Sequence, residues 1–378
     1  MTPRIGILGS GFAADIHSKT LRSVAPAVPR WYASRDPGRA AAIAARSGGA
    51  GHFGSYDAAL ASRDIDAVII ALPPSLHHEW ARRALDAGKH VIVEKPPFLT
   101  LSELDDIESI AVRAGRQVLV AENYFYKPLT RLLRTTIAEG DLGAVLLIQL
   151  NALKRQKTSD WRDQPELAGG GALFEGGIHW VSLLANIGLT PIGARAAFPR
   201  ARHGAGEAGT ADRARRPELQ LGRADVAGGT IGAGEARIRS HDSVASFGGA
   251  TTDRSAVVTI EYAEGAVATL SYSWDLPGLI NGMRMSRVYG TGGSLRFETN
   301  GVFAVLAGRR HRLCFPGLVD LAGHRAMMTD FIAAIEQNRP PAYNLTLARR
   351  DLQLIEQAYA TVPDAALKGS RYRHSQQT

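Results

Sequence analysis

Two short stretches in the first hundred residues are notable for their residue types. Gly9–Ala14 reads Gly-Ser-Gly-Phe-Ala-Ala and directly follows an apolar run. A glycine turn after a strand lets backbone amides and a helix N-terminus approach a pyrophosphate. Glu94-Lys95-Pro96 follows a later apolar run. A lysine there can exchange a proton if its surroundings disfavour its charge, and as a cation it can stabilise a developing alkoxide. A surface salt bridge is the alternative for Lys95.

The surrounding residues predict strands that alternate with helices. The expected strands are 5–8, 30–33, 66–71, 90–93 and 117–120, and the expected helices are 13–21, 37–46, 56–61, 77–87 and 102–114. This alternation predicts a parallel sheet covered by helices on both faces. Ligands of such sheets bind outside the carboxyl ends of the strands. The glycine turn and Lys95 both lie at such ends.

These strand ends form the predicted cofactor rim. Gly9 permits the tight turn and Gly11 the approach of phosphates, while Ala14 stands where a third glycine is usual. A plain strand–helix turn is the alternative. The predicted cofactor contacts are Gly9, Gly11, Phe12, Ala13, Ser34, Arg35, Leu72, Pro73, His77, Glu94, Lys95 and Asn123.

The end of the second strand bears on the choice of cofactor. An acidic residue there would bind the ribose hydroxyls of NAD. This chain has Ser34-Arg35 instead, and a hydroxyl with a guanidinium suits a 2′-phosphate. Asp36 follows, and we assign it to the N-cap of the next helix. The sequence therefore favours NADP over NAD, with a solvated surface arginine as the alternative for Arg35.

Together these residues resemble a known family, the Gfo/Idh/MocA oxidoreductases, which include glucose–fructose oxidoreductase and inositol dehydrogenase. The matching stretches are Gly9–Ala14, Pro73-Pro74 with His77, Ala87–Val91 and Glu94–Pro96. Glu-Lys-Pro is specific in this context, whereas the glycine motif is shared with many dehydrogenases. The resemblance implies a Rossmann domain in residues 1–123. It also implies a C-terminal α/β domain in 124–378, built on a large, mostly antiparallel sheet.

The resemblance further implies hydride transfer between a nicotinamide cofactor and a hydroxyl of a sugar, cyclitol or related polyol. The family uses an acidic residue and a histidine in an Asp-x-Gly-x-His pattern. The matching stretch here is Glu175–His179, with glutamate in place of aspartate. His179 is then the general base or acid, with Lys95 as its partner or proton relay. Glu175 assists or binds substrate.

Residues 174–184 read as one helix, on which Glu175 and His179 stand at i and i+4 and share a face. A carboxylate there can orient the imidazole or bind a substrate hydroxyl. Histidine suits proton transfer because its ordinary pKa lies near neutrality. A structural histidine and a helix-start carboxylate are the alternatives. The residues predicted to contact substrate are Lys95, Asn123, Trp161, Arg162, Glu175 and His179.

His77, His78 and Glu79 are adjacent in the sequence and have side chains that can bind a metal ion. Neighbouring helical residues point to different faces, so one ion would not reach all three, and we predict no metal site. His77 is interpreted as a helix-start residue near the cofactor.

The second half predicts further strands near 145–150, 255–262, 266–274, 285–289 and 294–298, with helices at 321–337 and 345–360. Close spacing and glycine turns predict an antiparallel meander. Its outer face is expected to pair with another copy in a homodimer or homotetramer. Residues 200–240 are rich in Gly, Ala and Arg. This insert is interpreted as a flexible surface loop, with a lid or oligomer contact as the alternative.

Composition limits the classes of protein. The 378 residues exceed one ordinary core, and hydrophobic residues make up 45%. The net charge is +8, but the Lys and Arg residues are scattered, so we predict no nucleic-acid partner. The single cysteine, Cys314, excludes an intrachain disulfide. We found no apolar stretch long enough for a bilayer and no signal peptide, so a cytoplasmic protein without a membrane partner is expected.

Two hypotheses of different class follow. The first is an NADP-linked dehydrogenase or reductase of sugars or polyols. The second is a nicotinamide-binding regulatory protein on the same fold that does not turn over substrate. The lysine–histidine pair favours the enzyme, while Glu175 in place of the family aspartate keeps the regulator open.

Overall fold

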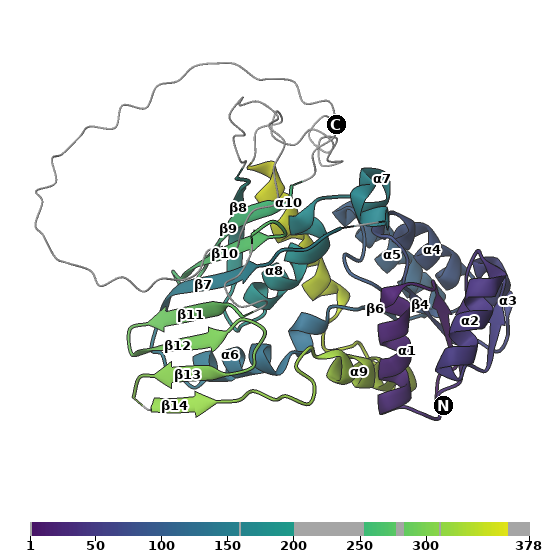
Figure 1. Ribbon diagram of the computed structural model, residues 1–378, viewed down its shortest axis with the longest axis horizontal. Coiled ribbons are helices and arrows are strands. Elements are labelled where there is room, and N and C mark those ends of the chain that lie inside the picture. Colours follow the sequence, from purple (N-terminus) through teal and green to yellow (C-terminus); the bar gives the residue numbers. More distant parts are fainter. Residues whose placement is uncertain (1, 159, 200–252, 277–282, 310, 362–378) are drawn as a thin grey trace, which may run out of the picture. The chain divides into compact units, whose positions relative to one another are not determined.

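The chain contains two β-sheets that differ in strand direction (Figure 1). A computed structural model describes residues 2–158, 160–199, 253–276, 283–309 and 311–361. The predicted insert at 200–240 lies outside these residues.

The first sheet has six parallel strands in the order β3-β2-β1-β4-β5-β6. They are β1 (Ile5–Leu8), β2 (Arg30–Ala33), β3 (Gly51–Phe53), β4 (Ala67–Ile70), β5 (His90–Val93) and β6 (Val118–Val120). This doubly wound order reverses between β1 and β4, where ligands of such sheets bind. The expected Rossmann-type parallel sheet is confirmed.

Helices α1 (Phe12–Val24), α2 (Pro37–Ser47), α3 (Tyr56–Ala61), α4 (His77–Asp86) and α5 (Leu101–Ala114) connect these strands. Asp36 caps α2 as expected, because its carboxylate accepts hydrogen bonds from the amides of Gly38 and Arg39. Gly48 ends the same helix in the left-handed conformation.

The second sheet has eight strands in the order β14-β13-β12-β11-β7-β10-β9-β8. They are β7 (Val145–Leu153), β8 (Pro191–Ala197), β9 (Ser255–Tyr262), β10 (Val267–Ser273), β11 (Met285–Gly290), β12 (Gly293–Glu298), β13 (Ala304–Ala307) and β14 (His311–Cys314). The sheet is mostly antiparallel, as expected. The continuous meander was wrong, because β7 lies between β10 and β11 and pairs parallel with β10.

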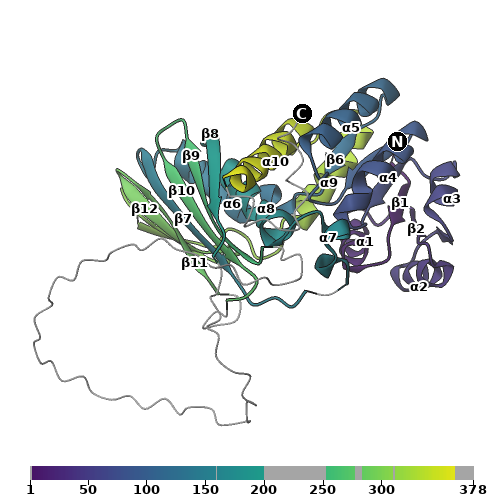
Figure 2. The ribbon, with the colours of Figure 1, turned by 90° about the horizontal axis from the view of Figure 1, so that it is seen from above.

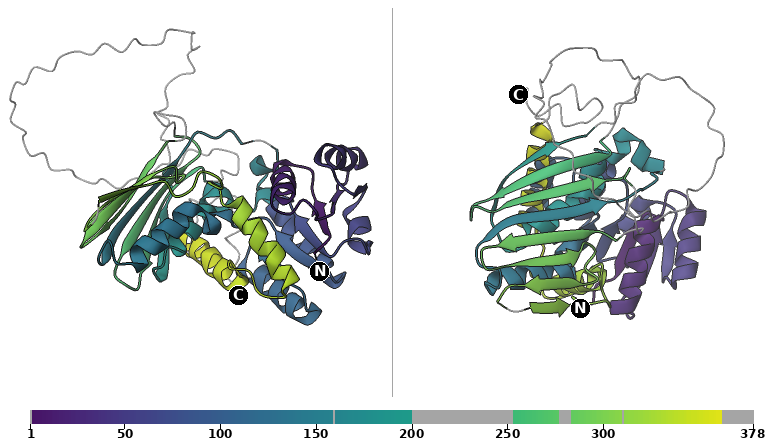
Figure 3. Two further views of the ribbon diagram at one scale, coloured as in Figure 1. Left: turned by 90° about the horizontal axis from the view of Figure 1, so that it is seen from below. Right: turned by 60° about the vertical axis from the view of Figure 1, so that its left-hand side comes forward.

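The helices of the second half are α6 (Pro128–Ala138), α7 (Pro165–Ala168), α8 (Ile178–Ala185), α9 (His324–Glu336) and α10 (Leu345–Ala360). Figure 2 shows α6, α8 and α10 along one face of the eight-stranded sheet. Figure 3 shows the other face, with no described helix over it. That outer face exposes apolar side chains, among them Leu147, Val257, Met285 and Val305.

Helix α9 contributes to the core of the first sheet although it comes late in the chain. Met327, Met328 and Phe331 are buried in one cluster with Ile5 and Leu21. Helix α9 packs against α1, so the C-terminal part of the chain completes the N-terminal layer. Among the described helices, none has the length and apolar character needed to cross a membrane.

Candidate active site

The glycine turn lies between β1 and α1 and is shaped for a ligand. Gly9 has a φ of +120°, and a Cβ there would lie 2.4 Å from the carbonyl oxygen of Ala71 at the end of β4. A Cβ on Gly11 would meet nothing within 4 Å. No side chain caps the N-terminus of α1, so its first amides can donate to an anion. Phe12 is 78% exposed beside them.

Substituting the two glycines should separate folding from binding. Gly9→Ala should lower the free energy of unfolding by at least ~1 kcal/mol, because its φ and the Ala71 carbonyl exclude a Cβ. Gly11→Ala should leave thermal unfolding unchanged but raise the cofactor Kd about tenfold, equivalent to about 1.4 kcal/mol. Its methyl would enter the open space that phosphates need. A calorimetric titration checks this prediction, and equal cofactor binding by wild type and Gly11→Ala would contradict it.

At the end of β2, the acidic side chain is already engaged. Ser34 is buried and its Oγ accepts a hydrogen bond from the Asp36 amide at 3.2 Å. Asp36 Oδ1 accepts from the amide of Gly38 at 2.9 Å. Arg35 is exposed and lies close to Tyr56, whose pKa is raised by burial against the opposing effect of Arg35. The guanidinium of Arg35 is thus the charged group here without a carboxylate partner among the described residues.

His77 is fully buried and joins two loops of the rim. Its Nε2 lies 2.9 Å from the carbonyl oxygen of Leu72, and its Nδ1 lies 2.9 Å from that of Pro96. Burial lowers the pKa of His77. The ring therefore ties the loop after β4, with Leu72 and Pro73, to the loop after β5. Its neighbour His78 pairs with Asp106 at 2.8 Å, and no described side chains converge in a way that would hold a metal ion.

Glu94 directly follows β5 and is fixed by a histidine that the sequence did not single out. His17 on α1 is 1% exposed, and its Nε2 lies 2.6 Å from Glu94 Oε1. Glu94 Oε2 accepts a hydrogen bond from the Lys95 amide at 3.1 Å. Burial alone would raise the pKa of Glu94, but His17 and Lys95 hold it at about 2. Glu94 is therefore a carboxylate that links the nucleotide-side helix α1 to the start of the Glu-Lys-Pro loop.

Lys95 reaches across to the second half of the chain. Its Nζ donates to the carbonyl oxygen of Glu175 at 2.6 Å and lies 3.7 Å from Glu175 Oε1. Arg162 Nε donates to Glu175 Oε1 at 3.1 Å. The Arg162 guanidinium lies over the Trp161 ring, 4.4 Å from its centroid. Burial would raise the pKa of Glu175, but these two cations lower it. Glu175 is thus an ionised, buried carboxylate shared by Lys95 and Arg162.

His179 does not use Glu175 as its partner, which corrects the expected geometry. Its Nδ1 lies 2.8 Å and 2.9 Å from the two carboxylate oxygens of Glu122, which follows β6. The predicted single helix is instead a π-helical turn over Leu173–Gly177 followed by α8. A π turn holds more residues than an α turn, so i and i+4 side chains no longer stack. Glu175 therefore turns toward Arg162, and Glu122 orients the imidazole.

The environment of the Glu122–His179 pair disfavours charge. Burial raises the pKa of Glu122 to about 8. Burial, and then Lys95, lower the pKa of His179 well below its ordinary value. Strongly coupled groups titrate as a pair, so their protons belong to the dyad rather than to either residue. In the one-proton form, Glu122 accepts from Nδ1–H and leaves the Nε2 lone pair free, which is the state of a general base.

An aromatic stack holds the other side of the imidazole. The Tyr124 ring lies parallel to His179 with centroids 4.3 Å apart, and Trp180 packs edge-on against Tyr124. Lys127 Nζ lies 4.4 Å from the Tyr124 centroid. Burial lowers the pKa of Lys127 to about 8. The stack and the carboxylate together leave the imidazole one orientation.

Asn123 holds a neighbouring segment rather than projecting a free amide. It is buried, and its Nδ2 donates to the carbonyl oxygen of Ala322 just before α9 at 2.7 Å. Its predicted contact with nicotinamide or substrate stays a prediction.

Two residues with clear contacts at this site, Glu122 and His17, were not among the predicted catalytic, cofactor-binding or substrate-binding residues. Glu122 carried a usable signal, since a carboxylate directly after a buried strand must find a partner. His17 gave no comparable signal, because one histidine on a helix is common in cores.

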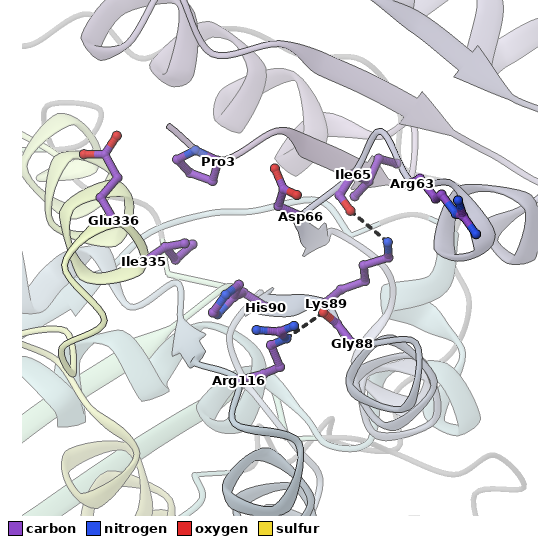
Figure 4. A pocket seen from close by; sticks show the side chains of 10 residues that line it. All are labelled: Pro3, Arg63, Ile65, Asp66, Gly88, Lys89, His90, Arg116, Ile335 and Glu336. Carbon is purple, nitrogen blue, oxygen red and sulfur yellow. Dashed lines mark hydrogen bonds between the residues drawn. The ribbon is translucent and has the colours of Figure 1, made fainter. Parts of the chain in front are cut away.

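A separate hollow of about 440 Å³ lies at the amino ends of β4 and β5, away from this rim (Figure 4). Two of its cations are already engaged: Lys89 Nζ donates to the carbonyl oxygens of Ser62 and Ile65, and Arg116 donates to that of Gly88. The rim at the carboxyl ends is the better candidate site.

Comparison with known proteins identifies the family of this chain. Residues 3–122 match the model of an oxidoreductase family with an NAD-binding Rossmann fold, and residues 130–296 match the GFO/IDH/MocA C-terminal domain. The chain belongs to the Gfo/Idh/MocA family of oxidoreductases. The rim of this family member fits a dinucleotide, because Gly11 leaves open space before the uncapped N-terminus of α1.

Relatives of this oxidoreductase are named as sugar dehydrogenases. D-xylose 1-dehydrogenase (NADP(+)) 2 of Haloferax volcanii is 38% identical over 38% of this chain and 45% of that protein. Levoglucosan dehydrogenase of Pseudarthrobacter phenanthrenivorans is 28% identical over 78% of this chain and 73% of that protein. The chain spans about half the length of several curated relatives that it matches.

A solved structure of levoglucosan dehydrogenase with NADH and levoglucosan has the same fold. The match covers 96% of this chain and 97% of that chain, with a TM-score of 0.74 and 21% identity.

Proposed function

We propose that this protein is an NAD(P)-dependent oxidoreductase that transfers hydride between nicotinamide and a hydroxyl or carbonyl of a sugar, cyclitol or related polyol. The observation that carries the proposal is the placement of Lys95 and the Glu122–His179 dyad at the carboxyl ends of neighbouring strands β5 and β6. The named relatives act on sugars, which supports the substrate class.

Different residues of the chain bind the cofactor, transfer the proton and hold the substrate. The amides at the start of α1 and the glycine turn would hold the cofactor phosphates, and the bound nicotinamide would accept or donate the hydride. His179 Nε2 takes the hydroxyl proton during oxidation and returns it during reduction. Lys95 holds the substrate oxygen and stabilises negative charge on it. Glu175 keeps Lys95 and Arg162 in place and can accept a hydrogen bond from a second hydroxyl.

The test is a turnover assay on the full chain. NADPH and NADH absorbance would be followed with sugars, cyclitols and their keto forms. Turnover of at least one compound supports the enzyme. Tight cofactor binding without turnover across the panel would favour the rival proposal, a nicotinamide-binding regulator. The Glu122–His179 dyad favours the enzyme, because a sensor has no use for an oriented base.

We also propose that NADP is preferred over NAD. Support comes from Arg35, which is exposed at the end of β2, and from Asp36, whose carboxylate is engaged in capping α2. The named relatives and their structures include both cofactors, so they do not decide the choice.

Arg35→Gln should therefore raise the Kd of NADPH by about 10- to 100-fold, the range expected for one charge-assisted hydrogen bond. NADH binding should stay unchanged. Fluorescence titration measures both, with Arg46→Gln in the last turn of α2 as the control. NADH binding much tighter than NADPH binding in the wild type would overturn the NADP assignment.

We further propose a boundary between the two domains near residue 123 and a homodimer or homotetramer through the outer face of the eight-stranded sheet. The exposed apolar side chains of that face support the assembly. Sedimentation of Val257→Lys against wild type would test it.

A further inference from the structure

Two cations on the helix-covered face of the eight-stranded sheet have no part in the chemistry above. Along β7, Ile148, Leu150 and Ala152 are buried, and alternation places Lys154 on the same face just beyond the strand. Along β11, Ser286 and Val288 are buried, which places Arg284 on that face as well.

The register brings these two cations together. Strands β7 and β11 are antiparallel, with Val288 opposite Ile148. Continuing this register sets Arg284 opposite Ala152, two residues from Lys154, and such diagonal neighbours are within reach of long side chains. Arg284 Nη1 donates to the Leu153 carbonyl oxygen at 3.5 Å.

Both cations lie near the reacting groups. The Arg284 guanidinium is 5.8 Å from the ring centroid of Trp180, the residue after His179. Partial burial lowers the pKa of Lys154; the carboxylate of Glu175 opposes this effect, and the positive charges of Arg284 and Lys95 add to it. Lys154 and Arg284 therefore border the same site as Lys95 and Glu175.

This part of the site has more positive than negative charge, even with the buried carboxylate of Glu298, to which Asn300 Nδ2 donates at 3.0 Å. Glu175 is already shared by Lys95 and Arg162. Glu94 and Glu122 are paired with His17 and His179. Within the described parts of the chain, neither Lys154 nor Arg284 forms an ion pair, and Arg284 Nη2 donates to the neutral Asn300 amide oxygen at 2.9 Å. Clustered cations without counter-ions are stabilised by a bound anion.

We propose that Lys154 and Arg284 bind an anionic group, so that the substrate is a sugar or polyol derivative that carries a carboxylate or a phosphate. This inference rests on the proposed function and names the substrate class of the same site. A planar guanidinium beside a mobile ammonium suits either anion through charge-assisted hydrogen bonds.

The test compares three probes on the NADPH-loaded full chain by calorimetric titration: glucose, glucuronate and glucose 6-phosphate. At low salt, at least one anionic probe should bind about tenfold or more tightly than glucose, the difference expected for a charged hydrogen bond. The tighter of the two identifies the anion as carboxylate or phosphate. The preference should weaken as salt is added.

Lys154→Gln and Arg284→Gln should each reduce the preference at least threefold, while glucose binding stays unchanged. Arg287→Gln is the matched control, because Arg287 is exposed on the outer face of the same strand. Lys154 is exposed, so its variant keeps the test independent of folding.

Equal binding of glucose and both anionic probes would overturn the inference, as would no binding of either anionic probe or a preference that survives both substitutions. A parallel turnover assay separates this result from the wider proposal. Turnover of neutral sugars without an anion preference leaves the oxidoreductase standing and the inference wrong. If the variants lose the anion preference but no compound is turned over by the wild type, the anion-binding inference stands and the proposed oxidoreductase reaction is wrong.

Discussion

Glu122→Gln should lower kcat/KM for alcohol oxidation by roughly 10³- to 10⁴-fold, the loss expected when a catalytic histidine is held in the wrong tautomer. The glutamine amide can donate to Nδ1 of His179, which leaves the ring proton on Nε2 and removes the base. In the wild type, oxidation should rise with pH through the apparent pKa of the dyad, because the one-proton form is the base. Carbonyl reduction should fall over the same range. Initial rates measured from pH 6 to 10 would test both trends, because this range extends about two units on either side of the raised pKa of Glu122.

Unfolding of the Glu122→Gln variant would not explain this loss of activity. The pKa of Glu122 is raised to about 8 in the folded protein, above its ordinary value of 4.5. The folded state therefore binds more protons between these values, and Glu122 makes stability fall as pH rises through that window. Glu122→Gln removes this effect, so its thermal unfolding at neutral pH should match or exceed that of the wild type. A small effect of Glu122→Gln beside a large effect of Glu175→Gln would return the orienting role to Glu175.

Lys95→Met should lower kcat by roughly 10²- to 10⁴-fold, the range expected for losing a proton-transfer partner and a stabilising charge. Arg162 still contacts Glu175 in this variant, so the buried carboxylate keeps a cation and the fold should persist. Single-turnover absorbance measures the hydride step, and calorimetry measures cofactor Kd.

Lys157→Met, at an exposed lysine, is the control and should retain wild-type rates. A Lys95→Met variant with near-normal kcat would contradict the role in chemistry. If the variant binds cofactor weakly but keeps its kcat at saturating cofactor, Lys95 contributes to cofactor binding and not to the chemical step.

The first sheet was predictable from sequence because most of its strands contain a short, buried apolar run. Val68–Ile70 and Val91–Val93 have no exposed side chain, so their hydrophobicity shows without any partner. Strand β3 was missed, since Gly51–Phe53 is short and not buried. In the second sheet, local patterns located β7, β9, β10, β11 and β12, missed β8, β13 and β14, and did not show which strands pair. Which strands pair depends on long-range contacts, and β7 reaches β10 and β11 across more than a hundred residues.

In the candidate site, too, local features were predictable from sequence and long-range contacts were not. The sequence drew attention to Lys95 through its place after an apolar strand, and to His179 through the resemblance to the family's acidic-residue and histidine pattern. The partner of that histidine was not, because a π turn changes side-chain directions without an obvious signal in Leu173–Gly177. Glu122 and His179 are 57 residues apart, and only the folded chain brings them to 2.8 Å.

Helix α9 limits how this protein can be recombined. Its side chains Met327, Met328 and Phe331 fill the layer over β1 and α1. A chimera that takes residues 1–123 from one relative and the rest from another would therefore set foreign packing surfaces against each other. Exchange of cofactor specificity between relatives should succeed when α9 travels with the N-terminal segment, and yield insoluble protein when it does not. The packing unit of the nucleotide-binding half is thus discontinuous in sequence.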